Sequence, residues 1–138
     1  MKYNTILGLL LLGLLSSSCG DKKSAYDKER EAAETNGKAC LTTARAALAE
    51  NDFQTAREAV EKMRKEYRLA INARAEGILL MDSINLLEAE HELKIVDKAL
   101  RDENAKDKDS LQIAFDDLFQ KSKFYKRKLE HDKKNSDQ

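Results

Sequence analysis

Residues 69–101, LAINARAEGILLMDSINLLEAEHELKIVDKALR, decide the fold, because their apolar side chains fall on two sides of one predicted helix. A helix that is apolar on most of its circumference is buried on more than one side. We therefore expect it to lie centrally, with a helical hairpin against one face and the final helix, or a partner, against the other. At 100° per residue, the main stripe is Ile71, Ala75, Ile78, Leu79, Leu86, Ala89, Leu93, Val96 and Leu100, and the second group is Leu80, Ile84, Leu87 and Ile95.

Two shorter helices are predicted before this central helix. Ser24, with Asp27 three residues later, is typical of a capping box at a helix start. Asn51-Asp52 indicates a tight turn, with Asp52 capping the second helix. Helical spacing predicts an antiparallel hairpin, whose first helix presents Tyr26, Ala33, Gly37, Cys40, Leu41, Ala44, Ala47 and Leu48, and whose second presents Phe53, Ala56, Val60, Met63 and Tyr67.

Gly37 and Cys40 both fall on the apolar face of the first helix. Glycine costs a helix about 1 kcal/mol relative to alanine, so Gly37 marks a close helix approach or splits the segment near Asn36-Gly37. If Cys19 is modified, Cys40 has no partner for a disulfide. We interpret Cys40 as a small apolar packing residue, the alternative being a reactive thiol.

Residues 38–68 resemble one tetratricopeptide-type hairpin. Asp52-Phe53 stands at the turn, Ala56 is the small residue facing the first helix, and Val60 and Met63 follow on the inner face. The chain departs from that family in having Arg68 where proline is common. Its first helix also carries Cys40, Thr43, Ala44 and Ala47 where that family prefers large and small apolar residues, and no second copy follows about 34 residues later. The resemblance implies a hairpin and not a repeat array.

The last third of the chain predicts one more helix. Residues 102–110, DENAKDKDS, are almost wholly polar and should turn the chain, with Asp109 or Ser110 capping the next helix. Because this segment contains neither Gly nor Pro, the alternative is one continuous helix through it. A narrow coiled-coil-like seam follows. We expect the charged chain to fray from Lys126 onward, which leaves a helical domain at 24–130 and a flexible tail at 131–138. The seam is formed by Leu111, Phe115, Leu118, Ser122, Tyr125 and Leu129.

Three residues invite a functional interpretation. Ile113 and Phe124 are 11 residues apart, so they lie on one side of the last helix, nearly opposite the seam. They predict a partner-binding strip, or else they are incidental or pack on a neighbouring helix. Asp82 falls within the main stripe, where a carboxylate must be paired. We expect an ion pair with Arg74 or a basic residue of another helix, or a helix-edge position, with ligand contact as the alternative.

Composition and motifs argue against several classes of function. Without residues 1–18 the chain has a net charge near −1, and a nucleic-acid partner would need a concentrated basic surface. The chain has no phosphate-binding loop, paired zinc-type cysteines or nucleophile elbow. Glu88 and His91 have the spacing of di-iron bundles, but His131 would lie roughly 15 Å away along a folded-back helix pair. We expect no catalytic site, metal or cofactor.

The amino-terminal stretch predicts the location of the protein. Lys2, the short apolar run 6–15 and three serines indicate a secretion signal, too short for a membrane span. Leu15-Ser16-Ser17-Ser18-Cys19 resembles the lipobox of bacterial lipoproteins, although Ser16 stands where leucine is usual. The resemblance implies cleavage before Cys19, a diacylglycerol thioether on its sulfur, and usually a further acyl chain such as palmitate on its new amino group. The alternative is an ordinary secreted protein.

These observations combine into one expectation. The chain is a small all-α bundle with a signal peptide at 1–18, the lipidated Cys19 and a tether to residue 23, and a helical domain that binds another envelope protein. Gly20 is not the aspartate that signals retention in the inner membrane, so the outer membrane is favoured; the close Asp21 leaves surface export open. The alternatives are a self-associating spacer, built as a coiled coil or swapped dimer, and a ligand-binding lipoprotein with a cavity near Asp82.

Overall fold

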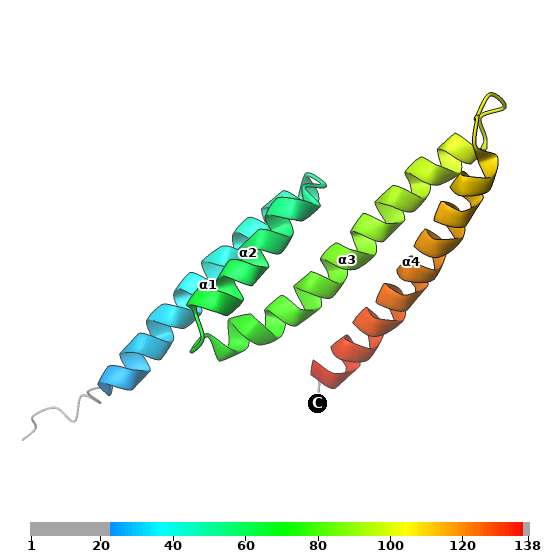
Figure 1. Ribbon diagram of the computed structural model, residues 1–138. Coiled ribbons are helices and arrows are strands. Elements are labelled where there is room, and N and C mark those ends of the chain that lie inside the picture. The colour runs from blue at the N-terminus through cyan, green and yellow to red at the C-terminus, as the bar shows by residue number, and fades with distance from the viewer. Residues whose placement is uncertain (1–22, 137–138) are drawn as a thin grey trace, which may run out of the picture.

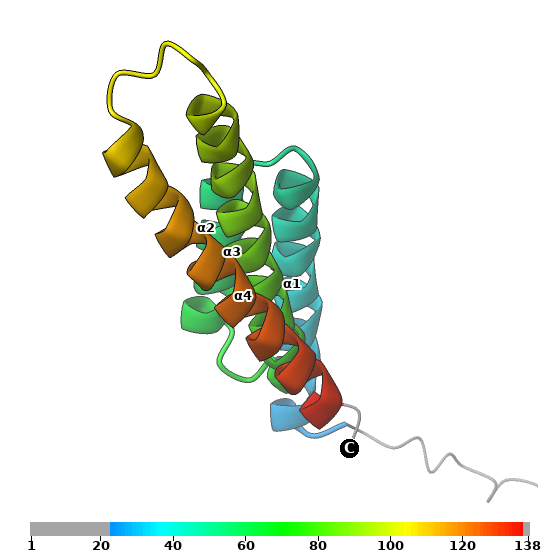
Figure 2. The same cartoon turned by 90° about the vertical axis from the view of Figure 1, so that its right-hand side faces the viewer.

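Four helices and no strand make up the regular structure of residues 23–136, the part of the chain that this computed structural model describes. They are α1 (Ala25–Ala49), α2 (Phe53–Glu66), α3 (Ile71–Leu100) and α4 (Lys108–Ser136). Helices α1 and α2 form one layer, α3 the next, and α4 the last (Figures 1 and 2). The predicted all-α bundle, with its hairpin, central helix and final coiled-coil-like helix, is confirmed.

Local capping chemistry fixes the ends of the first two helices. Ser24 and Asp27 form the expected capping box at the start of α1. At its end Asn51 takes the left-handed conformation, with φ of 59°. The N–H groups of Asn51 and Asp52 donate to the carbonyls of Leu48 and Ala47 at 3.1 and 2.9 Å, which is a Schellman motif. The Asp52 carboxylate then accepts from the Thr55 N–H and begins α2, as the sequence predicts.

The start of α3 is capped by a side chain from another helix. Its own N-cap residue, Ala70, offers no side-chain acceptor. The carboxylate of Glu34, in α1, accepts from the backbone N–H groups of Asn72 and Ala73 at 2.8 and 3.0 Å. A carboxylate there satisfies otherwise unpaired donors and opposes the positive end of the helix dipole. Glu34 therefore ties α1 to α3 by a bond that neither helix could make alone.

Gly37 explains how α1 comes so close to α3 at this point. Helix α1 runs unbroken through Gly37, so the close-approach interpretation holds and the split does not. A Cβ atom placed there would lie 2.9 Å from the Cβ of Ala73 and 3.0 Å from that of Ala70. Both neighbours are short and stiff. The missing side chain is therefore what lets the two backbones meet.

The main core lies between the hairpin and the first half of α3. Its members are almost all aliphatic, with Cys40 half-buried beside them: Leu41, Ala44, Ala56, Val60, Met63, Ala70, Ala73, Leu80 and Ile84. At the edge of this core, Arg57 of α2 donates to Asn85 and to Glu88 of α3 at 2.6 Å each. Arg74 bonds the Arg64 carbonyl at the end of α2, and so is not the partner of Asp82. The hairpin is thus fixed to α3 at both ends of α2.

The two faces of α3 are covered in a staggered way. The face of Leu80 and Ile84 packs on the hairpin, which reaches as far as the ring contact between Phe53 and His91, at 5.6 Å. Leu87 and Ile95, expected on that face, are exposed. The main stripe faces α4, and its first members are exposed too. Periodicity identified the two faces, but two members of the second group and three of the main stripe are exposed, so neither stripe is covered at every position. The exposed members of the main stripe are Ile71, Ala75 and Ile78.

The polar segment after α3 does turn the chain, so the continuous-helix alternative is wrong. The Asp102 carboxylate accepts from the Asn104 N–H at 2.9 Å, closing a tight turn. Asp107, and not Asp109 or Ser110, caps α4, since its carboxylate accepts from the Ser110 N–H at 3.1 Å. The Ser110 side chain and this backbone bond together lower the pKa of Asp107 below its ordinary value.

Helix α4 extends further than expected. It continues to Ser136, past Lys126 and through most of the segment at 131–138 that we expected to be flexible. Side-chain pairs stabilise these last turns: Lys128 pairs with Asp132, four residues later, and also with Asp82 of α3.

In residues 23–136 no helix is long and apolar enough to cross a bilayer.

The close approach at Gly37 gives the first prediction. Gly37→Ala should lower the free energy of unfolding by about 1–2 kcal/mol, because overpacking costs more than the gain in helix propensity. Urea denaturation followed by circular dichroism measures this. Thr35→Ala, two residues away on the exposed side of α1, is the control. In an Ala73→Gly background, where the nearest methyl is gone, Gly37→Ala should cost less. Equal stability of Gly37→Ala and the control would contradict the close packing.

Candidate functional site

Helix α4 rests on α3 along the seam that the sequence predicts. Its seam residues are half-buried, and Leu129 is buried. Within residues 23–136, α3 is the only helix that α4 contacts. Figure 2 shows α4 crossing α3 on the side away from the hairpin. A helix held along one seam exposes the rest of its circumference, so the opposite face is available to a partner.

Ile113 and Phe124 lie on that opposite face. Their side chains are 64% and 58% exposed, and Ile113 is the most exposed large apolar residue of the described chain. The Phe124 ring meets the ring of Tyr125 edge-on, with centroids 5.2 Å apart. The alternative in which this pair packs on a neighbouring helix is therefore wrong. Whether they bind a partner stays a prediction.

Charges divide the outer face of α4 into two halves. Counting 100° per residue, Asp109 and Asp116 lie beside Ile113 in the first half, together with Asp117. Lys123 and Arg127 lie beside Phe124 in the second half. All five are exposed. Lys123 is held near the helix surface by its position over the Phe119 ring, 4.5 Å from the centroid. We call this surface, from Asp109 to Arg127, the outer face of α4.

Asp82 has a structural partner. Its side chain is only 4% exposed, and both carboxylate oxygens accept from the Lys128 ammonium at 2.7 Å. Asp132 accepts from the same ammonium at 2.9 Å. The hydrogen bonds to Asp82 and Asp132 raise the pKa of Lys128, and those from His131 and Lys128 lower the pKa of Asp132 to about 2. The ion pair with a basic residue of another helix is the expected structural role, and it fixes α4 to α3.

The histidines do not meet at a metal site. His91 is exposed, and its ring lies 5.6 Å from the ring of Phe53. The Glu88 carboxylate forms an ion pair with Arg57. His131 lies beside Asp132 and Asn135 on the last turns of α4. Among residues 23–136, no three His, Cys, Asp or Glu side chains lie close enough together to hold an ion.

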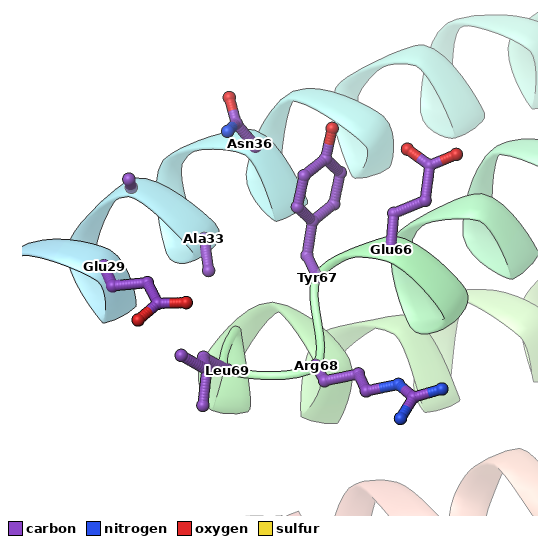
Figure 3. Close-up of a pocket in the computed structure, with 8 residues that line it drawn as sticks. Glu29, Ala33, Asn36, Glu66, Tyr67, Arg68 and Leu69 are labelled. Carbon is purple, nitrogen blue, oxygen red and sulfur yellow. The ribbon is translucent and has the colours of Figure 1, made fainter. Parts of the chain in front are cut away.

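A shallow hollow of about 330 Å³ lies between the start of α1 and the α2–α3 connection. In Figure 3 the Tyr67 ring rises toward α1, whereas the Arg68 side chain extends away from Glu29 and Ala33. The hollow is lined by isolated side chains on an open surface, and Asp82 is not among them. This hollow is therefore not the cavity near Asp82 that a ligand-binding protein would need. We give the outer face of α4 preference as the candidate site.

Sequence reasoning missed two groups of residues. The Arg57 contacts with Asn85 and Glu88 join residues about 30 positions apart, and no local pattern indicates them. The two charged halves of the outer face could have been found. Placing Asp116 and Lys123 on the same helical projection as Ile113 and Phe124 would have shown them.

Comparison with known proteins adds no family to this description. No protein-family model, curated protein or solved structure matches the chain. Cys19, the predicted lipidation site, and the tether up to residue 22 lie outside the described residues.

The exposure of the outer face yields a stability prediction. Ile113→Ser with Phe124→Ser should lower the free energy of unfolding by less than about 1 kcal/mol, because both side chains already lie in solvent. Leu118→Ser, on the opposite seam, should cost about 2 kcal/mol or more through lost burial. Thermal and urea unfolding of the two variants measure the difference. Loss of helicity in the double variant would instead place this pair in the core.

The Asp82–Lys128 ion pair yields a second prediction about stability. Lys128→Met leaves a buried carboxylate without its cation, which should cost about 2–3 kcal/mol, less than a fully buried pair because the ammonium is partly exposed. Replacing both residues, Asp82→Leu with Lys128→Met, should restore most of this loss. Lys126→Met, exposed on the same helix, is the matched control. If urea titrations give Lys128→Met and Lys126→Met the same stability, the pair does not fix α4.

Proposed function

We propose that this chain is a lipid-anchored, non-catalytic module of a bacterial cell envelope that binds another protein through the outer face of α4. Two independent features support the proposal. The lipobox-like run ending at Cys19 supports the anchor. The exposed Ile113 and Phe124, on a helix that packs on α3 alone among the helices of residues 23–136, are the observation that carries the binding role.

The anchor follows from the chemistry of the resemblance. A diacylglycerol thioether on Cys19 and an acyl chain on its amino group each bury many methylenes, at about 0.8 kcal/mol per CH₂. Two such signals hold a protein stably on a bilayer. Gly20 after the cysteine favours the outer membrane. Anchoring would supply the location, and the helical domain would supply the contact.

The binding role follows from what the outer face presents. Isolated exposed apolar residues are normal on any protein. Here an exposed aromatic and an exposed isoleucine share one side of a long helix, with an ordered set of charges around them. Aromatic anchors surrounded by polar residues are typical of protein interfaces. A ligand-binding role has less support, because both oxygens of Asp82 are occupied by Lys128.

The experiment that tests this proposal labels the full chain in cells with an alkyne analogue of palmitate. The wild type should take up label and sediment with membranes. Cys19→Ser should lose the label and leave the membrane fraction. The matched control is Cys40→Ser, which removes the other cysteine of the chain and should keep both properties. An unlabelled wild-type chain in the soluble fraction, with its leader uncut, would overturn the anchor.

A further inference from the structure

We infer that the partner bound by the outer face of α4 is a second copy of this chain, with the two α4 helices packed antiparallel. This inference rests on the proposed function and names the partner of the same surface. It is carried by the arrangement of charge and apolar side chains along α4. The chain itself supplies a complementary surface, so no other protein has to be assumed.

Charge complementarity selects the antiparallel orientation. The outer face carries Asp109, Asp116 and Asp117 in its first half and Lys123 and Arg127 in its second. Two parallel copies in register would place acid against acid and base against base. Two antiparallel copies place the acidic half of each against the basic half of the other. Opposite charges at an interface fix its orientation and reject the wrong one.

The apolar pair then sets the register. Ile113, Asp117, Gln120 and Phe124 follow one another at spacings of four, three and four residues, which is the repeat of a coiled-coil seam. If the two-fold axis passes between residues 118 and 119, Ile113 of each copy lies opposite Phe124 of the other. The same alignment brings Asp116 to within about 3 Å, along the axis, of the level of the other copy's Lys123. One symmetric arrangement thus places Ile113 opposite Phe124 and Asp116 near Lys123, while Asp117 faces Gln120 beside the two-fold axis.

The helix dipole does not account for this charge pattern. Acidic residues near the start of a helix and basic ones near its end are favourable on that ground alone. This explains Asp109, in the first turn, and Lys133 and Lys134, in the last. The effect falls off within one turn of each end. Asp116, Asp117 and Lys123 lie in the middle of a 29-residue helix, where the dipole gives no reason for their order.

A pairing through two apolar residues per copy is weak in dilute solution. Anchoring raises the effective concentration, because two molecules on one bilayer are confined to the same surface. In the antiparallel pair, the two α1 helices begin at opposite ends, since the start of α1 (blue in Figure 1) lies at the end of the molecule away from the α3–α4 turn. The pair would therefore lie along the bilayer, with one tether at each end.

Disulfide cross-linking of the full chain in membranes tests the arrangement. Ile113→Cys and Phe124→Cys, each in a Cys40→Ser background that removes the half-buried thiol, are expressed together, with different tags, and treated with a mild oxidant. The antiparallel pair should give a dimer of twice the chain mass that carries both tags, at a yield several times that of either variant alone. A parallel pair would instead give dimers from each variant alone. That result, or no dimer at all, overturns the inference.

Charge reversal supplies the matched control. Asp116→Lys or Lys123→Asp alone opposes like charges at two symmetric contacts, and each should lower the cross-linked yield roughly threefold or more. The two changes together exchange the charges and should restore it. A restored yield supports the antiparallel contact, and a double variant as poor as the singles counts against it.

The experiment also separates the two proposals. Cross-links from residue 113 or 124 to a protein of different mass would overturn self-pairing and leave the proposed binding role intact. A dimer band from a Cys40→Ser chain, in which Cys19 is the remaining cysteine, would report a free Cys19 thiol and count against the anchor and not against the pairing. A mixed-tag dimer formed by a protein that takes up no acyl label would support the pairing and count against the anchor.

Discussion

The structure depends on one constraint, which is that α3 is apolar on two faces and must be covered on both. The α1–α2 hairpin covers one face from the start of the helix to about His91. Helix α4 covers the other face, chiefly along the second half of α3. Neither covering element reaches the full length of its stripe. The exposed Ile78 and Ile95 mark the two uncovered ends on α3.

This staggered cover leaves α4 with a single neighbour among the described helices. The hairpin and α3 share a core in which Ile84 and Met63 are fully buried, whereas on α4 only Leu129 is buried. Two interactions compensate at the far end of α4. Lys128 binds the buried Asp82, and the four-residue pairing of Lys128 with Asp132 extends the helix beyond its last apolar residue. A helix held in this way can present its whole outer face, and that is the property on which the proposed pairing relies.

The sequence predicted the parts of this fold that are decided locally. Ser24 was identified as a cap from Asp27 three residues later, and Asp52 from its position directly before the periodic apolar run that begins at Phe53. The cap of α4 was assigned to Asp109 or Ser110 and proved to be Asp107, because residues 102–110 offer three aspartates and one serine, among which the local sequence does not select. Both faces of α3 were recovered from periodicity. Their exposed ends were not, because periodicity gives the direction of a face and not the length of what covers it.

Nonlocal partners were the other limit. Asp82 was correctly expected to pair with a base, yet Arg74 on its own helix and Lys128, 46 residues away, were indistinguishable until the helices were placed. Glu34 capping α3 and Arg57 bonding Glu88 are of the same kind. Ile113 and Phe124 were placed on an outward side from spacing alone, and their exposure agrees with this. The charges that suggest their partner were present in the same helical projection.

Amide hydrogen exchange tests the central claim most directly, because it measures the opening free energy of each helix separately. If α3 is the sole support of α4 within the described chain, amides of 111–125 should exchange at a clearly lower opening free energy than those of 73–84 at low protein concentration. If the two segments exchange at the same free energy there, α4 belongs to one cooperative core with the hairpin and α3. That result would contradict a fold in which a singly supported helix offers its free face.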